Sequence, residues 1–133
     1  MFSGRCECGR VVYRVDGEVE NFSHCHCSQC RRLHGAAYVS FAGVRQQDFR
    51  YTSGTEDLCS YRSSEGSERV FCGVCGSSML VTLDSEPDAM YVALGTADEA
   101  PELPPAYHIF VGSKAAWHRI LDDAPQYDTE PGE

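Results

Sequence analysis

The sequence predicts a single, mainly β domain in which antiparallel strands are accompanied by short helices. Segments with the residue pattern of strands recur about every ten residues, and few segments show the spacing of a helix. At 133 residues, the chain has the length of one domain with its own apolar core. These observations favour one mainly β domain over a helical or a multidomain protein.

The predicted strands are short runs of β-branched and aromatic residues that end at residues typical of turns. Residues 77–83 and 89–94 flank a proline-containing turn and predict a hairpin. The polar, glycine-containing stretches 51–57 and 62–68 are expected to be loops. The other predicted strands are residues 11–15, 37–44 and 107–111.

Two short helices are expected. The first begins near Ser28, inside the sequence HCHCSQC. The second follows Ser113, whose hydroxyl can cap the first turn of a helix, and continues to Leu121. Within it, Trp117 and Leu121 are spaced as on one face of a helix.

The net charge of −9 is concentrated towards the end of the sequence. Residues 122–133 contain five acidic residues, two prolines and no lysine or arginine. We expect one folded domain at residues 1–121, followed by a solvated acidic tail at residues 122–133. The sequence has no basic stripe that could bind a phosphate backbone, so nucleic acid is not an expected partner.

The first residues lack the apolar segment of a secretory signal, and no run of about 18 apolar residues could span a bilayer. We therefore expect a cytoplasmic protein without a membrane partner. Cysteines in the cytoplasm are usually reduced. The eight cysteines are thus expected to bind metal rather than to form disulfides.

Four cysteines form two pairs with the spacing of zinc ligands. In the C-x-x-C sequence of Cys72 and Cys75, a glycine follows each cysteine, as in turns that bind structural zinc. The alternative, a thioredoxin-type redox pair, would need a βαβ pattern that the sequence lacks. Cys6 and Cys8, two residues apart on a segment expected to be extended, should present both thiolates on one face. These four thiolates predict a closed site for a structural zinc ion.

Three other cysteines predict a second zinc site with an open position. Cys25 and Cys27 should share one face of an extended segment, and Cys30 follows Cys27 by one helical turn. Three protein ligands leave a fourth position for water or substrate, as in catalytic zinc sites. The alternative is a structural site closed by Cys59 or by a histidine. Cys59 stands alone in the sequence, and we expect it to be a small buried side chain.

Histidines and arginines lie beside this second group of cysteines. His24 and His26 alternate with the cysteines, so their side chains should project away from the sulfur atoms. His26 is the candidate for proton transfer, and a histidine that is packed or exposed for other reasons is the alternative. Three further residues could offset the thiolate charge, bind an anionic substrate or form a solvated helix face: Arg31, Arg32 and His34.

Five segments resemble, in order and spacing, those of a known family. They are GRCECGRVVYRV, SHCHCSQCRRLHGAAYVSF, YRSSEGSERVFCGVCGSSM, ALGT and HIFVGSKAAWHRILDDAPQY. The chain resembles the glutathione-dependent formaldehyde-activating enzyme family, which includes centromere protein V. The resemblance implies coiled antiparallel sheets and two zinc ions. It also implies that the structural zinc ligands are Cys6, Cys8, Cys72 and Cys75, and that the catalytic zinc ligands are Cys25, Cys27 and Cys30.

The resemblance implies a carbon–sulfur lyase activity, the reversible formation of S-hydroxymethylglutathione from glutathione and formaldehyde. The expected partners are therefore a small thiol such as glutathione and an aldehyde. The zinc ion would bind the thiolate of the substrate or polarise the carbonyl oxygen. A second hypothesis is a protein-binding module in which both zinc ions are structural. A third, hydrolysis by zinc-activated water, would be expected to use histidine or carboxylate ligands.

Overall fold

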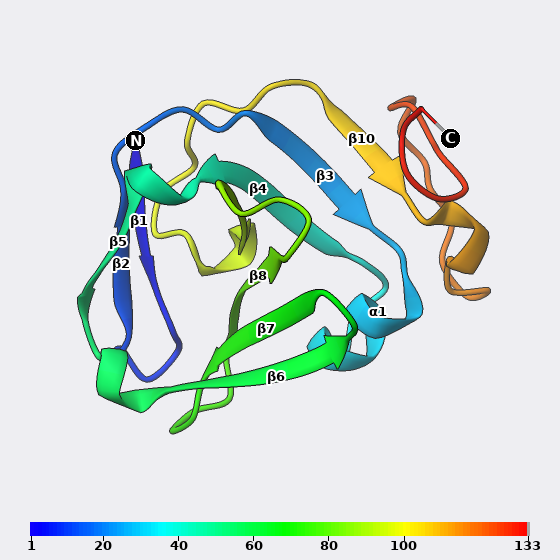
Figure 1. Ribbon diagram of the computed structural model, residues 1–133. Coiled ribbons are helices and arrows are strands. Elements are labelled where there is room, and N and C mark those ends of the chain that lie inside the picture. Colours follow the sequence, from blue (N-terminus) through cyan, green and yellow to red (C-terminus); the bar gives the residue numbers. More distant parts are fainter. Residues whose placement is uncertain (133) are drawn as a thin grey trace.

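A computed structural model of the chain describes residues 1–132, and within them ten strands form two sheets (Figure 1). The smaller sheet has the order β1-β2-β5, and its neighbouring strands are antiparallel. Its strands are β1 (Phe2–Arg5), β2 (Val12–Val15) and β5 (Phe49–Ser53). The prediction of a mainly β fold is confirmed.

The larger sheet has the order β10-β3-β4-β9-β8-β7-β6. Its neighbouring strands are antiparallel except β10, which runs parallel to β3. This pair differs from the wholly antiparallel arrangement that the sequence predicts. The strands are β3 (Asn21–Cys25), β4 (Val39–Arg45), β6 (Leu58–Ser64), β7 (Ser67–Cys72), β8 (Ser78–Leu83), β9 (Ala89–Ala93) and β10 (Ala106–Ile109).

The predicted strands correspond to β2, β4, β8, β9 and β10, and the predicted hairpin of β8 and β9 forms. The expected loops are partly wrong. Residues 62–68 form the ends of β6 and β7, with a tight turn at residues 65–66, and residues 51–53 belong to β5. Gly66 has a φ of 79° in this turn, which lets a polar sequence reverse direction within a hairpin.

The described residues contain one α-helix, α1 (Ser28–His34), where the sequence predicts the first helix. Gly35 ends it in the left-handed conformation, and its backbone N–H donates to the Arg31 carbonyl. None of the described helices has the length and apolar character needed to cross a bilayer.

The second predicted helix is wrong, because a 3₁₀ turn at Val111–Ser113 leads into irregular chain. A short helix needs an apolar face packed against the protein. Trp117 and Leu121, which would form this face, are 75% and 84% exposed. The carbonyl groups of Ala115 and His118 instead accept hydrogen bonds from the Lys114 ammonium group.

Strand β4 separates two apolar clusters. Its side chains alternate, so that Ala42 and Val44 lie in the larger cluster and Val39 and Phe41 in the smaller one. Burial on both faces explains why residues 37–44 form an almost continuous apolar run. Each cluster also contains two buried cysteines: Cys6 and Cys72 in the larger, and Cys25 and Cys30 in the smaller.

The acidic C-terminal segment is hydrogen-bonded along β10. The backbone N–H of His108 donates to the Pro125 carbonyl, and that of Tyr127 donates to the His108 carbonyl. The acidic side chains of the described part stay exposed, as expected of a solvated tail. The division after residue 121 remains a prediction, and Glu133 lies outside the described residues.

Candidate metal centres

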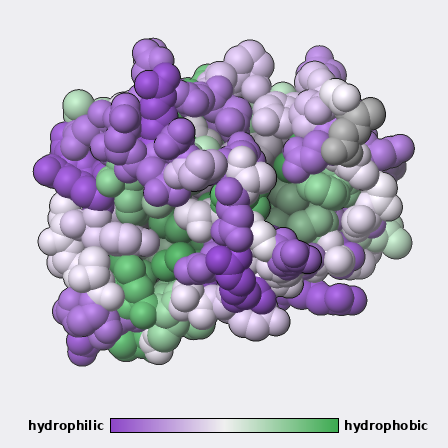
Figure 2. Space-filling view, in the orientation of Figure 1, coloured by the Kyte–Doolittle hydropathy of each residue, from purple (hydrophilic) through white to green (hydrophobic). Residues whose placement is uncertain are grey.

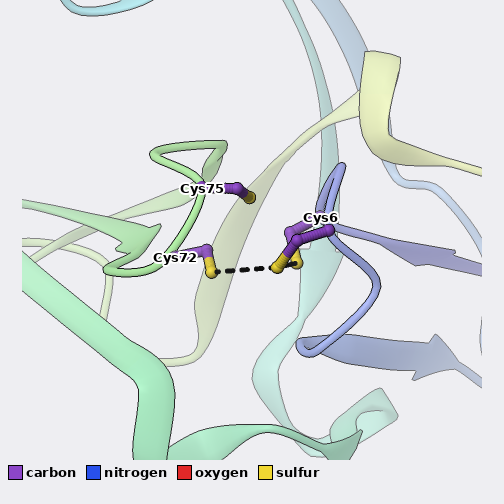
Figure 3. Close-up of side chains that lie close together, drawn as sticks. Cys6, Cys72 and Cys75 are labelled. Atoms are coloured by element: carbon purple, nitrogen blue, oxygen red, sulfur yellow. Dashed lines mark hydrogen bonds between the residues drawn. The ribbon is translucent and has the colours of Figure 1, made fainter.

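Four cysteines from two distant turns come together at one end of the sheets. Cys6 and Cys8 follow β1, whereas Cys72 ends β7 and Cys75 lies in the turn that follows. All four sulfur atoms lie within 4.8 Å of one another. Figure 3 shows the side chains of Cys72 and Cys75 pointing from their turn towards Cys6. This group, the four-cysteine site, contains the four residues that the sequence predicts and could hold one metal ion.

A glycine in the left-handed conformation closes each of the two turns. Gly9 and Gly76 have φ values of 81° and 82°, which glycine adopts without strain. The N–H of Gly9 donates to the Cys6 carbonyl, and the N–H of Gly76 donates to the Cys72 carbonyl. The expected extended segment at Cys6 is therefore wrong, because the chain folds back at Gly9. The two sulfur atoms of this turn still lie side by side, 3.5 Å apart.

Ser77 connects the two turns of the four-cysteine site. Its hydroxyl oxygen accepts a hydrogen bond from the Glu7 N–H at 3.0 Å and lies 3.2 Å from the Cys75 sulfur. The Ser77 hydroxyl can therefore donate to Cys75, and this bond lowers the pKa of Cys75 to about 5. The deprotonated thiolate that results is the form in which cysteine binds metal.

The second group, the three-cysteine site, lies where β3 leads into α1. Cys25 ends β3, Cys27 is the N-cap of α1, and Cys30 lies in the first turn of the helix. The Cys30 N–H donates to the Cys27 sulfur at 3.3 Å. The three sulfur atoms lie within 4.8 Å of one another, and no fourth cysteine, histidine or carboxylate of residues 1–132 joins them. The structure thus brings the three predicted residues together, and they could hold a metal ion.

The neighbouring thiols favour the ionised form of Cys27. The closeness of the Cys25 and Cys30 side chains lowers the pKa of Cys27 to about 2. The closeness of Cys27 in turn raises the pKa of Cys25. The three-cysteine site therefore contains a stabilised thiolate, which is the protonation state of a metal ligand.

Arg69 on β7 contacts the three-cysteine site, and the sequence analysis missed it. Its Nη1 donates to the Cys30 sulfur at 3.4 Å, and its Nε donates to the Ser63 hydroxyl at 3.2 Å. Arg31, Arg32 and His34, which follow Cys30, lie in the last turn of α1. Burial lowers the pKa of His34 to about 4, so this side chain is neutral at pH 7, and the two arginines supply the positive charge that offsets the helix dipole. The one sequence feature that could have indicated Arg69 is its place in the cysteine-containing segment SERVFC. This feature does not show which group its side chain contacts, because that depends on how the strands pair.

A cavity of about 1100 Å³ opens beside the three-cysteine site. Its size is typical of pockets that bind small molecules. Figure 2 shows apolar surface, bordered by hydrophilic residues, in the part of the molecule where β3 and β10 end. The wall of the cavity includes the three cysteines and four aromatic side chains: Phe41, Tyr91, Tyr107 and Phe110. A small molecule in this cavity could therefore reach the sulfur atoms.

His26 is fully buried and is bonded to a histidine rather than to a cysteine. Its Nε2 lies 2.8 Å from Nδ1 of His108, and Nε2 of His108 lies 3.0 Å from Oδ1 of Asp122. Because an ionised carboxylate only accepts, His108 donates to Asp122 from Nε2. Burial lowers the pKa of His26 to about 4, so its imidazole is neutral at pH 7.

The proposed proton transfer by His26 stays a prediction. The imidazole ring of His26 packs against the rings of Tyr38, His108 and His118, away from the sulfur atoms as the alternation with the cysteines predicts. The chain of hydrogen bonds through His108 connects β3, β10 and the C-terminal segment. No sequence pattern indicates this connection, because His26 and His108 are 82 residues apart.

Cys59 lies near the four-cysteine site rather than the three-cysteine site. Its sulfur occupies the space where a side chain at position 73 would lie, beside Gly73 in the turn between Cys72 and Cys75. The expectation of a buried Cys59 is wrong, because β6 is an edge strand of the larger sheet and this side chain is exposed.

Residues 1–113 match the family model of the glutathione-dependent formaldehyde-activating enzyme. The chain belongs to this family. The matched region contains all seven cysteines of the two candidate metal sites.

Two known proteins are similar to this chain. A crystal structure of a Rhodobacter sphaeroides protein is similar, with a TM-score of 0.63 and 28% identity, over 77% of this chain and 97% of that chain. An uncharacterized lyase of Schizosaccharomyces pombe is 28% identical over 78 residues, which are 59% of this chain and 55% of that protein. The chain therefore spans little more than half the length of the curated relative that it matches.

Removing one ligand from each site should have different consequences. Cys72 is fully buried in the larger cluster, whereas Cys27 lines the cavity. We expect Cys72→Ser to lower the thermal unfolding midpoint strongly and Cys27→Ser to lower it little, since structural metal sites contribute folding energy. Metal analysis should give about two ions per chain for the unaltered protein and about one for each variant. Equal losses of stability in the two variants would contradict this division of roles.

The hydrogen bond between His108 and Asp122 should stabilise the C-terminal segment. This bond holds the pKa of Asp122 below its usual value, so the stabilisation is present above the ordinary carboxyl pKa of about 4 and is lost as the pH falls below it. We expect Asp122→Asn to speed hydrogen exchange of the His108 amide at pH 7. Asp123→Asn removes an equal charge from the neighbouring exposed residue and serves as the control. The same exchange rate in both variants would show that the bond is not needed.

Proposed function

We propose that the chain is a zinc-dependent carbon–sulfur lyase that acts on a thiol–aldehyde adduct of the S-hydroxymethylglutathione type. The observation that carries the proposal is a group of three cysteines on the wall of a cavity of about 1100 Å³. Membership of the family and the relative named as a lyase support an activity of this type. Glutathione, named in the family description, is the proposed thiol, and formaldehyde is the proposed aldehyde.

The donor atoms of both sites fit Zn²⁺. Four thiolates are a usual ligand set of structural zinc, and three thiolates leave one position for a further ligand. An ion at the three-cysteine site would supply Lewis acidity and a binding position for a thiol sulfur. Thiolate ligands also require a reducing environment, so a cytoplasmic location is part of the proposal. The structural ligands would be Cys6, Cys8, Cys72 and Cys75, and the catalytic ones Cys25, Cys27 and Cys30.

The cavity residues would bind the substrate and limit the access of water to the sulfur atoms. The aromatic side chains of the wall offer apolar surface next to Cys25 and Cys27. The hydroxyl of Tyr91 donates to the Glu86 carboxylate at 2.6 Å. Burial raises the pKa of Tyr91, so this phenol stays protonated and remains a donor at neutral pH.

Cobalt-substituted protein tests whether the three-cysteine site accepts a thiol. Cobalt reports changes of its ligands in the visible absorption, which is followed as glutathione is added. We expect a saturable change that Cys27→Ser abolishes, because this variant loses one of the three sulfur atoms. A folded Cys75→Ser variant, altered at the four-cysteine site, should retain the change and serves as the control. No change at millimolar glutathione would contradict the proposal and favour a protein-binding module with two structural ions.

A further inference from the structure

A divalent ion bound by three thiolates carries one net negative charge, and a thiolate from a substrate would add a second. The three-cysteine site therefore needs nearby positive charge if it is to bind an anionic ligand well. The rest of the cavity does not supply it, because the charged residues there other than Arg69 are carboxylates: Glu65, Asp84, Glu86 and Glu130. Arg69 is the one basic residue among those described on this wall.

The position of Arg69 is set by the sheet. It lies on β7 between Tyr61 of β6 and Val81 of β8, so neighbouring strands fix its backbone on both sides. Its side chain lines the large cavity and also a smaller, mostly apolar cavity of about 340 Å³. Arg69 thus lines both cavities, and its hydrogen bonds to Ser63 and Cys30 hold the guanidinium beside the cysteines.

Within residues 1–132, Arg69 makes no ion pair with a carboxylate, so its charge is directed to the sulfur atoms. Its Nη1 donates to the Cys30 sulfur at 3.4 Å. Arg62, on the same hairpin, is different, because it is exposed and pairs with Glu68 and Asp84. Arg62 is therefore a matched control for Arg69.

We propose that Arg69 is a positioning residue that holds the Cys30 sulfur and gives the three-cysteine site a preference for anionic over neutral ligands. This inference rests on the proposed function in that a metal ion occupies the site. It goes further, because it states that the thiol binds as its anion and names the residue responsible. The guanidinium acts in two ways: its charge stabilises an incoming anion, and its N–H reduces the donor strength of the Cys30 sulfur.

Two small ligands of the cobalt-substituted protein distinguish a loss of positive charge at Arg69 from a structural change of the site. Azide is an anionic ligand and imidazole is a neutral one, and both change the visible absorption when they bind cobalt. We expect Arg69→Met to weaken azide binding about tenfold and to leave imidazole binding within about twofold, since only the anion interacts with the lost charge. Arg62→Met should change neither affinity.

The thiolate-to-cobalt absorption band gives a second readout. Loss of the hydrogen bond to Cys30 makes this sulfur a stronger donor, so the band should move to longer wavelength in Arg69→Met. Arg69→Lys keeps the charge but cannot keep both directional bonds, to Cys30 and Ser63. It should therefore restore azide binding without fully restoring the band position. If Arg69→Met does not fold, Arg69→Gln replaces it, because that variant also removes the charge.

Three results would overturn the inference. These are an equal loss of azide and imidazole binding in the Arg69 variants, an effect of Arg62→Met as large as that of Arg69→Met, and an unaltered protein that binds neither probe. A different result would contradict the proposed function alone. If azide binding depends on Arg69 as expected but glutathione causes no change, the site prefers anions and its substrate is not this thiol.

Discussion

The gathering of four thiols from two turns is the constraint on which the rest of the structure depends. Cys8 and Cys72 are 64 residues apart in the chain, and their sulfur atoms are 3.9 Å apart. A metal ion at this site would join the turn after β1 to the turn after β7, and so tie the smaller sheet to the larger one. Such a link stabilises the fold mainly where it closes a long loop.

Strand β7 carries the effect of this constraint to the second site. Cys72 at its end belongs to the four-cysteine site, and Arg69, three residues earlier, contacts the three-cysteine site. Residues three apart on a strand project to opposite faces. One strand thus presents a side chain to each of the two sites. The two groups of thiols differ in their surroundings, because four cysteines gather in one group and the three of the other group border a cavity.

The sequence predicted the parts of the molecule that depend on local spacing. The two cysteine groups, the helix that begins at Ser28 and the hairpin of β8 and β9 all follow from residues close together in the chain. The helix towards Leu121 was not predictable in the same way, because a short helix forms only if the rest of the fold covers its apolar face. Arg69 was missed because its contact with Cys30 requires the order of strands in the larger sheet, which the sequence pattern does not specify.

Zinc X-ray absorption on the unaltered protein, purified under reducing conditions without added small thiols, tests the central claim most directly. If one site is closed by four thiolates and the other keeps a position for a ligand, the protein should hold about two zinc ions per chain, with an average of about 3.5 sulfur and about 0.5 nitrogen or oxygen neighbours per zinc. An average of four sulfur neighbours per zinc would mean that the protein closes both sites, and would contradict the account.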